Sequence, residues 1–293
     1  MQGEAQPPRL TDTSAQISRI ALYVLLILLA IAILFPFYWM VATSLKTNPE
    51  AFYYPPDFYP PQPTLEHYEI IMTRDDINVP RWGWNSLVIA VATTVVTLFV
   101  TSLAAYGFAR LDFPFKNLIF IVVIFTLMIP SQIYMIPNYL LVRDLGWLDT
   151  YHAVIWPAAP NVFGLFLLRQ FFSTFPRELE EAATVDGASR IRIYWQLMIP
   201  VNRNALIALG IFVFLHSWND LFWPLIVLSR VENRTLPVGL AVLAGAYGAG
   251  DSFSEPALIM AASSMSSIPV LIVYVIFQRR ITQSFMLTGM GGR

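Results

Sequence analysis

The sequence contains no cysteine and little charge. The absence of cysteine among its 293 residues excludes disulfides, thiolate metal sites and cysteine nucleophiles. Charged residues make up 13% of the chain, against about 25% in an ordinary soluble domain. Hydrophobic residues make up 56%, and the mean hydropathy is +0.58, which places the chain in the membrane class. A net charge of -1 argues against a nucleic-acid partner.

Residues that could carry bond chemistry are also scarce. The histidines His67, His152 and His216 are far apart and show no metal-ligand spacing. The chain contains no GxxxxGK[ST] phosphate loop. If nucleotide energy drives this protein, another chain must bind the nucleotide, and we expect no cofactor or metal on this one.

Long uncharged runs predict an all-α membrane protein with six transmembrane helices. About 20 apolar residues cross a bilayer core of roughly 30 Å. The expected spans are residues 20–42, 84–109, 118 to about 129, 151–168, 205–228 and 256–278. The first run is too long for a typical signal-peptide core and lacks a clear cleavage site, so we expect it to be retained. The run SQIYMIPNYLLVRDLGW, after the third span, predicts a shorter helix near the surface.

Basic residues indicate how these spans are oriented. With six spans, 12 of the 18 Lys and Arg residues fall in segments on the side of the termini and 6 on the other. The positive-inside rule then places both termini in the cytoplasm. The expected organisation is a cytoplasmic N-terminal segment (1–19), a six-span domain (20–278) and a cytoplasmic C-terminal tail (279–293). Residues 46–83, rich in proline and aromatics, and residues 229–255 form outer segments.

Residues 177–200 form a charged hairpin between two apolar spans. Pro176 predicts a first helical position, with Ser173 or Thr174 as its cap. Acidic residues crowd the first turns, where the helix dipole favours them. Gly187 is placed to end this first helix in a left-handed conformation.

A second short helix should follow at once. Ser189 can cap it, and Pro200 ends its pattern. Its apolar residues recur at helical spacing and predict a single stripe: Ile191, Tyr194, Trp195 and Met198. Such a pair of helices is either a surface connector or a protein-binding element. The small face of the first helix, formed by Leu179, Ala182 and Ala183, and the aromatic pair of the second favour a protein-binding element.

The hairpin resembles the EAA motif of ABC importer permeases. Glu181-Ala182-Ala183 is followed by Gly187 four positions after the last alanine and by a hydrophobic stretch that ends at Pro200. Asp186-Gly187-Ala188 is similar to the version in maltose-type carbohydrate permeases. The resemblance extends over nearly the whole chain, including residues 163–172, 218–220 and 278–280.

The resemblance implies a type I permease fold and a coupling helix that docks into a cleft of an ATPase subunit. Glu181 would be the acidic contact, Ala182 and Ala183 the close-packed face, and Gly187 the turn. The remaining residues of the implied contact are Asp186, Tyr194 and Pro200.

The resemblance also implies a multisubunit transporter in a bacterial or archaeal plasma membrane. Its implied partners are a second homologous permease, two ATPase subunits that hold ATP and Mg²⁺, and an extracytoplasmic binding protein. This chain would be no enzyme itself. The implied cargo is a sugar, an oligosaccharide or a glycerophosphoryl-type polyol. The alternative is another solute, such as a peptide or an amino acid, against which the tail and the triplet at residues 218–220 weigh.

In relatives of this type the tail reaches between the ATPase subunits. The matching positions here are Gln278, Arg279, Thr288 and Gly289. The ending departs from the usual family pattern, because Gly291 stands where a lysine is common and the basic residue comes last.

Polar residues within the spans are candidates for the translocation path. An acid inside a span costs roughly 2.5–3.5 kcal/mol on insertion scales, so it should face a cavity or a partner. Asp220, with Trp218 and Asn219, lines the path in one interpretation and is a hydrated or capping acid at the outer end in the other. Asn161 either opens the fourth span to water or marks a kink. His216 is better explained as a hydrogen-bonding side chain between helices than as a proton carrier.

The outer glycine-rich segment offers one more candidate. In relatives a loop at this place meets the external binding protein, which points to Tyr247 and Gly248 here. A solvated linker explains the composition equally well.

Two rival classes remain open. An intramembrane enzyme would need convergent nucleophile, base or metal ligands, and the spans hold few ionisable groups, His216 and Asp220 among them. A channel would not need the exposed charged hairpin. A neighbouring gene for a second permease and another for a secreted binding protein would favour the importer.

Overall fold

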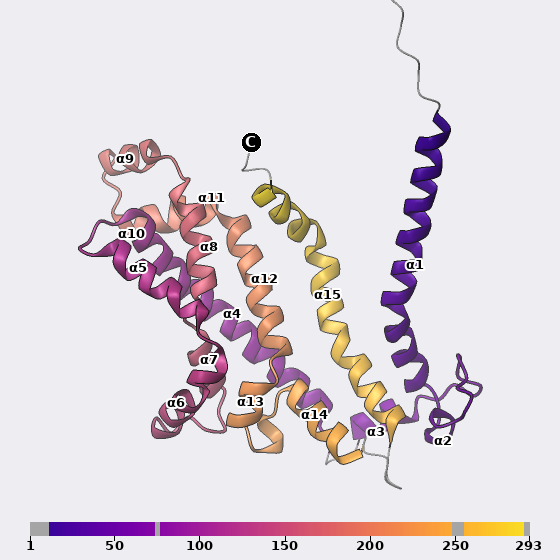
Figure 1. Cartoon of the computed structure of the whole chain (residues 1–293). Helices are drawn as coiled ribbons and strands as arrows, with labels where there is room; N and C mark the ends of the chain where they lie inside the picture. The colour runs from indigo at the N-terminus through magenta and orange to yellow at the C-terminus, as the bar shows by residue number, and fades with distance from the viewer. Residues whose placement is uncertain (1–11, 74–76, 248–254, 290–293) are drawn as a thin grey trace, which may run out of the picture.

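The computed structural model describes residues 12–73, 77–247 and 255–289 (Figure 1). Every regular element in these ranges is helical, which confirms the all-α prediction. Three helices are long and apolar enough to span a membrane on their own: α1 (Asp12–Ser44), α4 (Val79–Arg110) and α15 (Pro256–Gly289).

Two bent pairs complete the set of candidate spans. Helix α5 (Lys116–Phe125) with the 3-10 turn η1 (Thr126–Met128) meets α6 (Ser131–Asp144) at 102°. The segment Arg190–Val201 meets α12 (Arg203–Asn219) at 78°. Counting each pair as one span gives five candidates in the described part of the chain, against the six expected. The short helix predicted after the third span is α6.

The fourth expected span, residues 151–168, is not one helix. It forms α7 (His152–Ala158) and α8 (Val162–Ser173). Pro160 lacks the amide hydrogen that a continuous helix needs. Asn161 starts the second helix, because its Oδ1 accepts a hydrogen bond from the Gly164 amide at 2.6 Å.

The fifth expected span, residues 205–228, is also interrupted. Helix α12 ends at Asn219, and α13 (Phe222–Val227) begins after a break. Asp220 lies in this break with an extended backbone, φ -68° and ψ 122°. The length of an apolar run in the sequence does not reveal such a break.

The outer and C-terminal segments contain more helix than expected. Residues 229–255 include a 3-10 turn, η3 (Val231–Asn233), and α14 (Leu236–Tyr247). Helix α15 continues to Gly289, so its axis runs 11 residues beyond the expected boundary at residue 278. The first outer segment adds α2 (Asn48–Ala51) and α3 (Glu66–Thr73).

Helix α4 lies at the centre of the packing. The buried apolar residues form three clusters, and α4 contributes to all of them. Ala105 and Tyr106 belong to the first cluster, Trp82 and Ala90 to the second, and Ile89 to the third. A helix shared by every cluster can connect one end of the molecule to the other as a rigid rod.

Helix α1 takes almost no part in this core. None of its most apolar 18-residue window is buried. Figure 1 shows α1 apart from the other helices, with only its end near α2 and α3 approaching α15. Its apolar surface is therefore left for lipid or for another subunit.

Candidate functional site

The charged hairpin projects from one end of the helices (Figure 1). The described end of α15 and the N-terminal end of α1 lie toward the same end. The hairpin consists of α9 (Arg177–Val185), α10 (Arg190–Ile193), a π-helix (Tyr194–Met198) and α11 (Ile199–Val201).

The turn between α9 and α10 has the predicted geometry. Gly187 adopts φ +80°, a left-handed conformation that favours glycine. The amide of Ala188 donates to the Ala183 carbonyl at 2.9 Å, which closes the end of α9. Ser189 then caps α10, because its Oγ accepts from the Arg192 amide at 3.3 Å.

The start of the hairpin differs from the prediction. Helix α9 begins at Arg177, and Pro176 is its N-cap residue rather than its first helical residue. Ser173 and Thr174 do not cap it, since their hydroxyls donate back to the carbonyls of Arg169 and Phe171 at the end of α8.

The face of α9 that resembles the coupling motif is largely exposed. Glu181, Ala182 and Asp186 are exposed, and Ala183 is partly buried. The large apolar side chain of Val185 beside them is 87% exposed. An exposed strip of acid, alanine and valine on a short helix suits the surface of another protein.

The opposite side of α9 is held by an ion pair that the sequence did not reveal. Arg110 Nε, at the end of α4, lies 2.9 Å from Glu180 Oε1. The two side chains are only 4% and 19% exposed. Arg110 also donates to the Phe175 carbonyl and lies over the Phe175 ring. Burial raises the pKa of the Glu180 carboxyl, and the Arg110 guanidinium opposes that rise.

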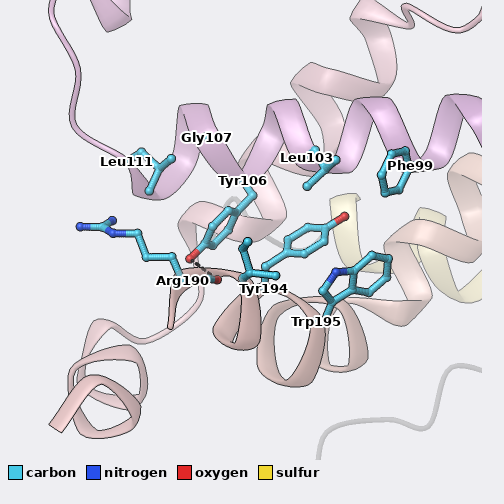
Figure 2. A pocket seen from close by; sticks show the side chains of 9 residues that line it. Phe99, Leu103, Tyr106, Gly107, Leu111, Arg190, Tyr194 and Trp195 are labelled. Atoms are coloured by element: carbon cyan, nitrogen blue, oxygen red, sulfur yellow. Dashed lines mark hydrogen bonds between the residues drawn. The ribbon is translucent and has the colours of Figure 1, made fainter. Parts of the chain in front are cut away.

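Two further contacts hold the second half of the hairpin. Tyr194 Oη lies 2.7 Å from Ser102 Oγ, and Tyr106 Oη donates to the Arg190 carbonyl at 3.4 Å (Figure 2). The two tyrosine rings pack with centroids 5.4 Å apart.

Ser102, Tyr106 and Arg110 are spaced four residues apart on α4, so they share one face of that helix. We call these three residues the inner clamp. Polar residues four positions apart at the end of an apolar span are the sequence pattern from which the inner clamp could have been predicted.

The predicted apolar stripe of the second helix is split. Tyr194 and Met198 are 2% and 0% exposed, whereas Ile191 and Trp195 are 72% and 51% exposed. The π-helix has a wider turn than an α-helix, so the predicted i, i+3, i+4, i+7 register does not carry through it. Pro200 lies inside α11 and is exposed.

The other end of α4 is hydrogen-bonded to the outer segment formed by residues 229–255. Asn85 is 1% exposed and donates to the carbonyls of Glu232 and Arg234, both at 2.8 Å. Its Oδ1 accepts from Tyr151 Oη at 2.6 Å.

Two neighbours of Asn85 add to this attachment. Trp82 Nε1 donates to the Val231 carbonyl at 2.9 Å, and Ser86 Oγ accepts from the Leu236 amide, at the start of α14, at 2.8 Å. We call Trp82, Asn85 and Ser86 the outer clamp. Helix α4 is thus bonded to the charged hairpin at one end and to the start of α14 at the other.

The candidate path residues do not gather at one place. Trp218 is 2% exposed and stacks on Phe214, whereas Asn219 is exposed and donates to the Leu215 carbonyl. Asp220 lies in the break after α12, and Asn161 caps α8. Within the described part of the chain, no group of three or more His, Asp or Glu side chains could hold a metal ion.

The remaining candidates lie at the limit of what is described. Gly248 lies outside the described residues. Tyr247 ends α14, and Arg279, Thr288 and Gly289 fall on α15, but their side chains lie outside the described ones. Gln278 is exposed on α15.

Comparison with known sequences identifies the family. Residues 97–286, which contain the hairpin and the inner clamp, match the family described as "Binding-protein-dependent transport system inner membrane component". The chain belongs to this family. The permease is also 33% identical over 276 residues to the arabinooligosaccharides transport system permease protein AraQ of Bacillus subtilis, covering 94% of this chain and 96% of the relative.

Other relatives agree in length and kind. The trehalose/maltose transport system permease protein MalG of Thermococcus litoralis is 34% identical, with 94% and 98% of the two chains covered. The sn-glycerol-3-phosphate transport system permease protein UgpE of Yersinia enterocolitica is 31% identical, with 88% and 92% covered.

A solved structure is similar throughout. It is the crystal structure of a bacterial ABC transporter involved in the import of the acidic polysaccharide alginate, with 26% identity and a TM-score of 0.79. The match covers 94% of this chain and 99% of that one. The permease is therefore a multi-pass inner-membrane subunit of an ABC importer, and such subunits work in a complex with ATPase and substrate-binding proteins.

Proposed function

We propose that this permease forms part of the membrane pathway of an importer for sugars, oligosaccharides or sugar-like polyols such as glycerophosphoryl compounds. The names of its relatives support this cargo class over peptides or amino acids. It pairs with a second, homologous permease and with two ATPase subunits that bind ATP and Mg²⁺. An extracytoplasmic binding protein delivers the substrate.

The observation that carries the proposal is a hairpin that is exposed on one face and clamped on the other. The exposed face, with Glu181, Ala182, Ala183, Asp186 and Gly187, docks into a cleft of the ATPase subunit. The clamped face transfers the movement of that subunit to α4. Because Tyr194 is buried against Ser102, it acts as an anchor of the hairpin within this chain rather than as a direct contact. Pro200, exposed in α11, stays in the proposed contact set.

The transport cycle follows from this linkage. Closure of the ATPase dimer on ATP moves the hairpin, and α4 moves with it because the inner clamp joins them. The helices then repack between inward- and outward-facing arrangements, as rigid elements with two discrete packings do. Both termini and the hairpin face the cytoplasm in this scheme, in a bacterial or archaeal plasma membrane.

Three further contacts belong to the proposal. The end of α15, with Gln278, Arg279, Thr288 and Gly289, reaches toward the ATPase subunits. The break at residues 218–220 and the kink at Asn161 border the path. Tyr247 and Gly248 meet the binding protein.

The test is reconstitution of the assembled complex with its binding protein. The binding protein is first screened for thermal stabilisation by oligosaccharides, glycerophosphodiesters, peptides and amino acids. We expect stabilisation by a carbohydrate or polyol, and uptake of that compound into proteoliposomes that depends on ATP. Stabilisation and uptake confined to a peptide or an amino acid would refute the proposed cargo.

A further inference from the structure

An open apolar groove lies between α4 and the second half of the hairpin (Figure 2). Its volume is about 370 Å³. Phe99, Leu103 and Gly107, spaced four residues apart along one face of α4, form one wall together with Leu111, the residue after the helix ends. The inner clamp uses a neighbouring face of α4, and its Tyr106 also lines the groove.

The other wall comes from the hairpin. The rings of Tyr194 and Trp195 face α4, and the rings of Trp195 and Phe99 stack with centroids 6.4 Å apart. The exposed polar surface of the groove is very small. An apolar groove of this kind at the end of a membrane span is filled by hydrocarbon rather than by water.

The groove has a charged end and an apolar end. Figure 2 shows Arg190 beside Leu111, where α4 finishes, and Phe99 with Trp195 at the opposite end. The twelve residues from Phe99 to Arg110, where α4 ends, correspond to about 18 Å of helix. One leaflet of the hydrocarbon core is about 15 Å thick, half of a roughly 30 Å core. The groove therefore has the length of one acyl chain.

The guanidinium of Arg190, at the charged end of the groove, forms no ion pair within the described part of the chain, although Glu180 attracts it at longer range. Arg190 is exposed, and the nearby carboxylate of Glu180 lies against Arg110. No described carboxylate lies within ion-pair distance of the Arg190 guanidinium. A guanidinium at the membrane boundary is suited to a phosphate, which it can bind with two hydrogen bonds.

We propose that this groove binds one anionic phospholipid, with its phosphate at Arg190 and one acyl chain between α4 and the Tyr194–Trp195 wall. The bound lipid fills the space beside the inner clamp and so supports the hairpin from the membrane side. The proposal rests on the proposed function only in placing this end of α4 at the cytoplasmic leaflet, and it is independent of the cargo.

Gly107 offers a direct way to close the groove. A Cβ at Gly107 would meet no atom within 4 Å, so the backbone there can carry a side chain, and Gly107→Phe should direct its ring into the groove. Gly83, on the same helix but outside the groove, has the same open surroundings, and Gly83→Phe is the matched control. Arg190→Gln removes the proposed phosphate contact, and Arg192→Gln, in the same short helix, is its control.

The experiment uses the assembled transporter in detergent. Phosphatidylglycerol or phosphatidylcholine with identical chains is added, and bound lipid is counted by native mass spectrometry. The unaltered complex should prefer phosphatidylglycerol. Arg190→Gln should lower that preference about fivefold, from about 1 kcal/mol per basic residue at an anionic surface. Gly107→Phe should abolish the retained lipid, and both controls should behave as the unaltered complex does.

Two results would overturn the proposal. The first is equal retention of phosphatidylglycerol by Gly107→Phe and Gly83→Phe. The second is loss of the partner permease, rather than of lipid, from the Gly107→Phe complex, which would make the groove a protein interface. Cargo uptake, measured separately, distinguishes either result from failure of the proposed function.

Discussion

The buried pair of Arg110 and Glu180 gives the sharpest prediction about the hairpin. Removing one partner of a buried ion pair leaves the other charge uncompensated and typically costs 3–5 kcal/mol. Because Glu180 is 19% exposed, water offsets part of this loss, and the low end of the range, about 3 kcal/mol, is the better expectation. We expect this cost for Glu180→Leu and for Arg110→Met alike.

The double variant should be more stable than either single one. Burial raises the Glu180 pKa although a cation lies beside it, so desolvation outweighs the attraction between the two charges. Replacing both charges by apolar side chains removes that desolvation cost. What remains is the lost hydrogen bond to the Phe175 carbonyl, worth about 1 kcal/mol.

The raised pKa of Glu180 also determines how the stability of the protein changes with pH. The folded protein binds a proton at Glu180 more readily than the unfolded chain does, so this group lowers stability as pH rises through the window between the two pKa values. Glu180→Gln should remove that decrease.

Amide hydrogen exchange in α9 is the suitable assay, because local opening of the hairpin exposes these amides. A loss of about 3 kcal/mol corresponds to exchange faster by about two orders of magnitude, since each 1.4 kcal/mol is tenfold. The single variants should show this acceleration, and the double variant should recover most of it. If the double variant exchanges as fast as the faster single variant, the pair does not hold α9 as described.

Three other substitutions test the turn and the outer clamp. Gly187→Asp should leave membrane insertion intact but impair ATPase coupling more than Gly187→Ala. Both variants strain the backbone at φ +80°, and a Cβ there meets no atom of this chain, so the added charge of aspartate acts on the ATPase contact; equal coupling in the two would place the defect in the turn itself. Asn85→Leu leaves two carbonyls and the Tyr151 hydroxyl without their partner, at about 1 kcal/mol or more each, so exchange across residues 229–236 should accelerate, and unchanged exchange would count against the outer clamp. Gly239→Ala would push a Cβ into the Trp82 ring, so it should lower thermal stability by about 1–3 kcal/mol, while Gly245→Ala in the same helix, with open surroundings, should not.

The hairpin was predictable because its signals are local. A left-handed backbone at Gly187 and a cap at Ser189 depend only on residues within one or two turns. Which acid turns inward was not predictable. Glu180 and Glu181 are neighbours in sequence, and only the way α9 lies against α4 assigns one to Arg110 and the other to the exposed face.

The breaks in the fourth and fifth spans show the limit of counting apolar residues. A hydropathy run records whether a segment can lie in a membrane, but the hydrogen bonds at Asn161 and the extended backbone at Asp220 depend on packing. Helix α14 was missed for a related reason. Its 12 residues are apolar but too short to cross a bilayer, so hydropathy alone does not separate them from the rest of the outer segment.

The separation of α1 from the three buried clusters affects how freely the sequence can vary. Side chains in a close-packed core restrict one another in volume and shape, whereas the exposed side chains of residues 21–37 in α1 face little such restriction from this chain. One apolar residue can replace another along this stretch without altering the fold of the rest. Any preference for particular residues along this stretch is therefore imposed by lipid or by other subunits. A mutational scan of α1 would show which positions contact them.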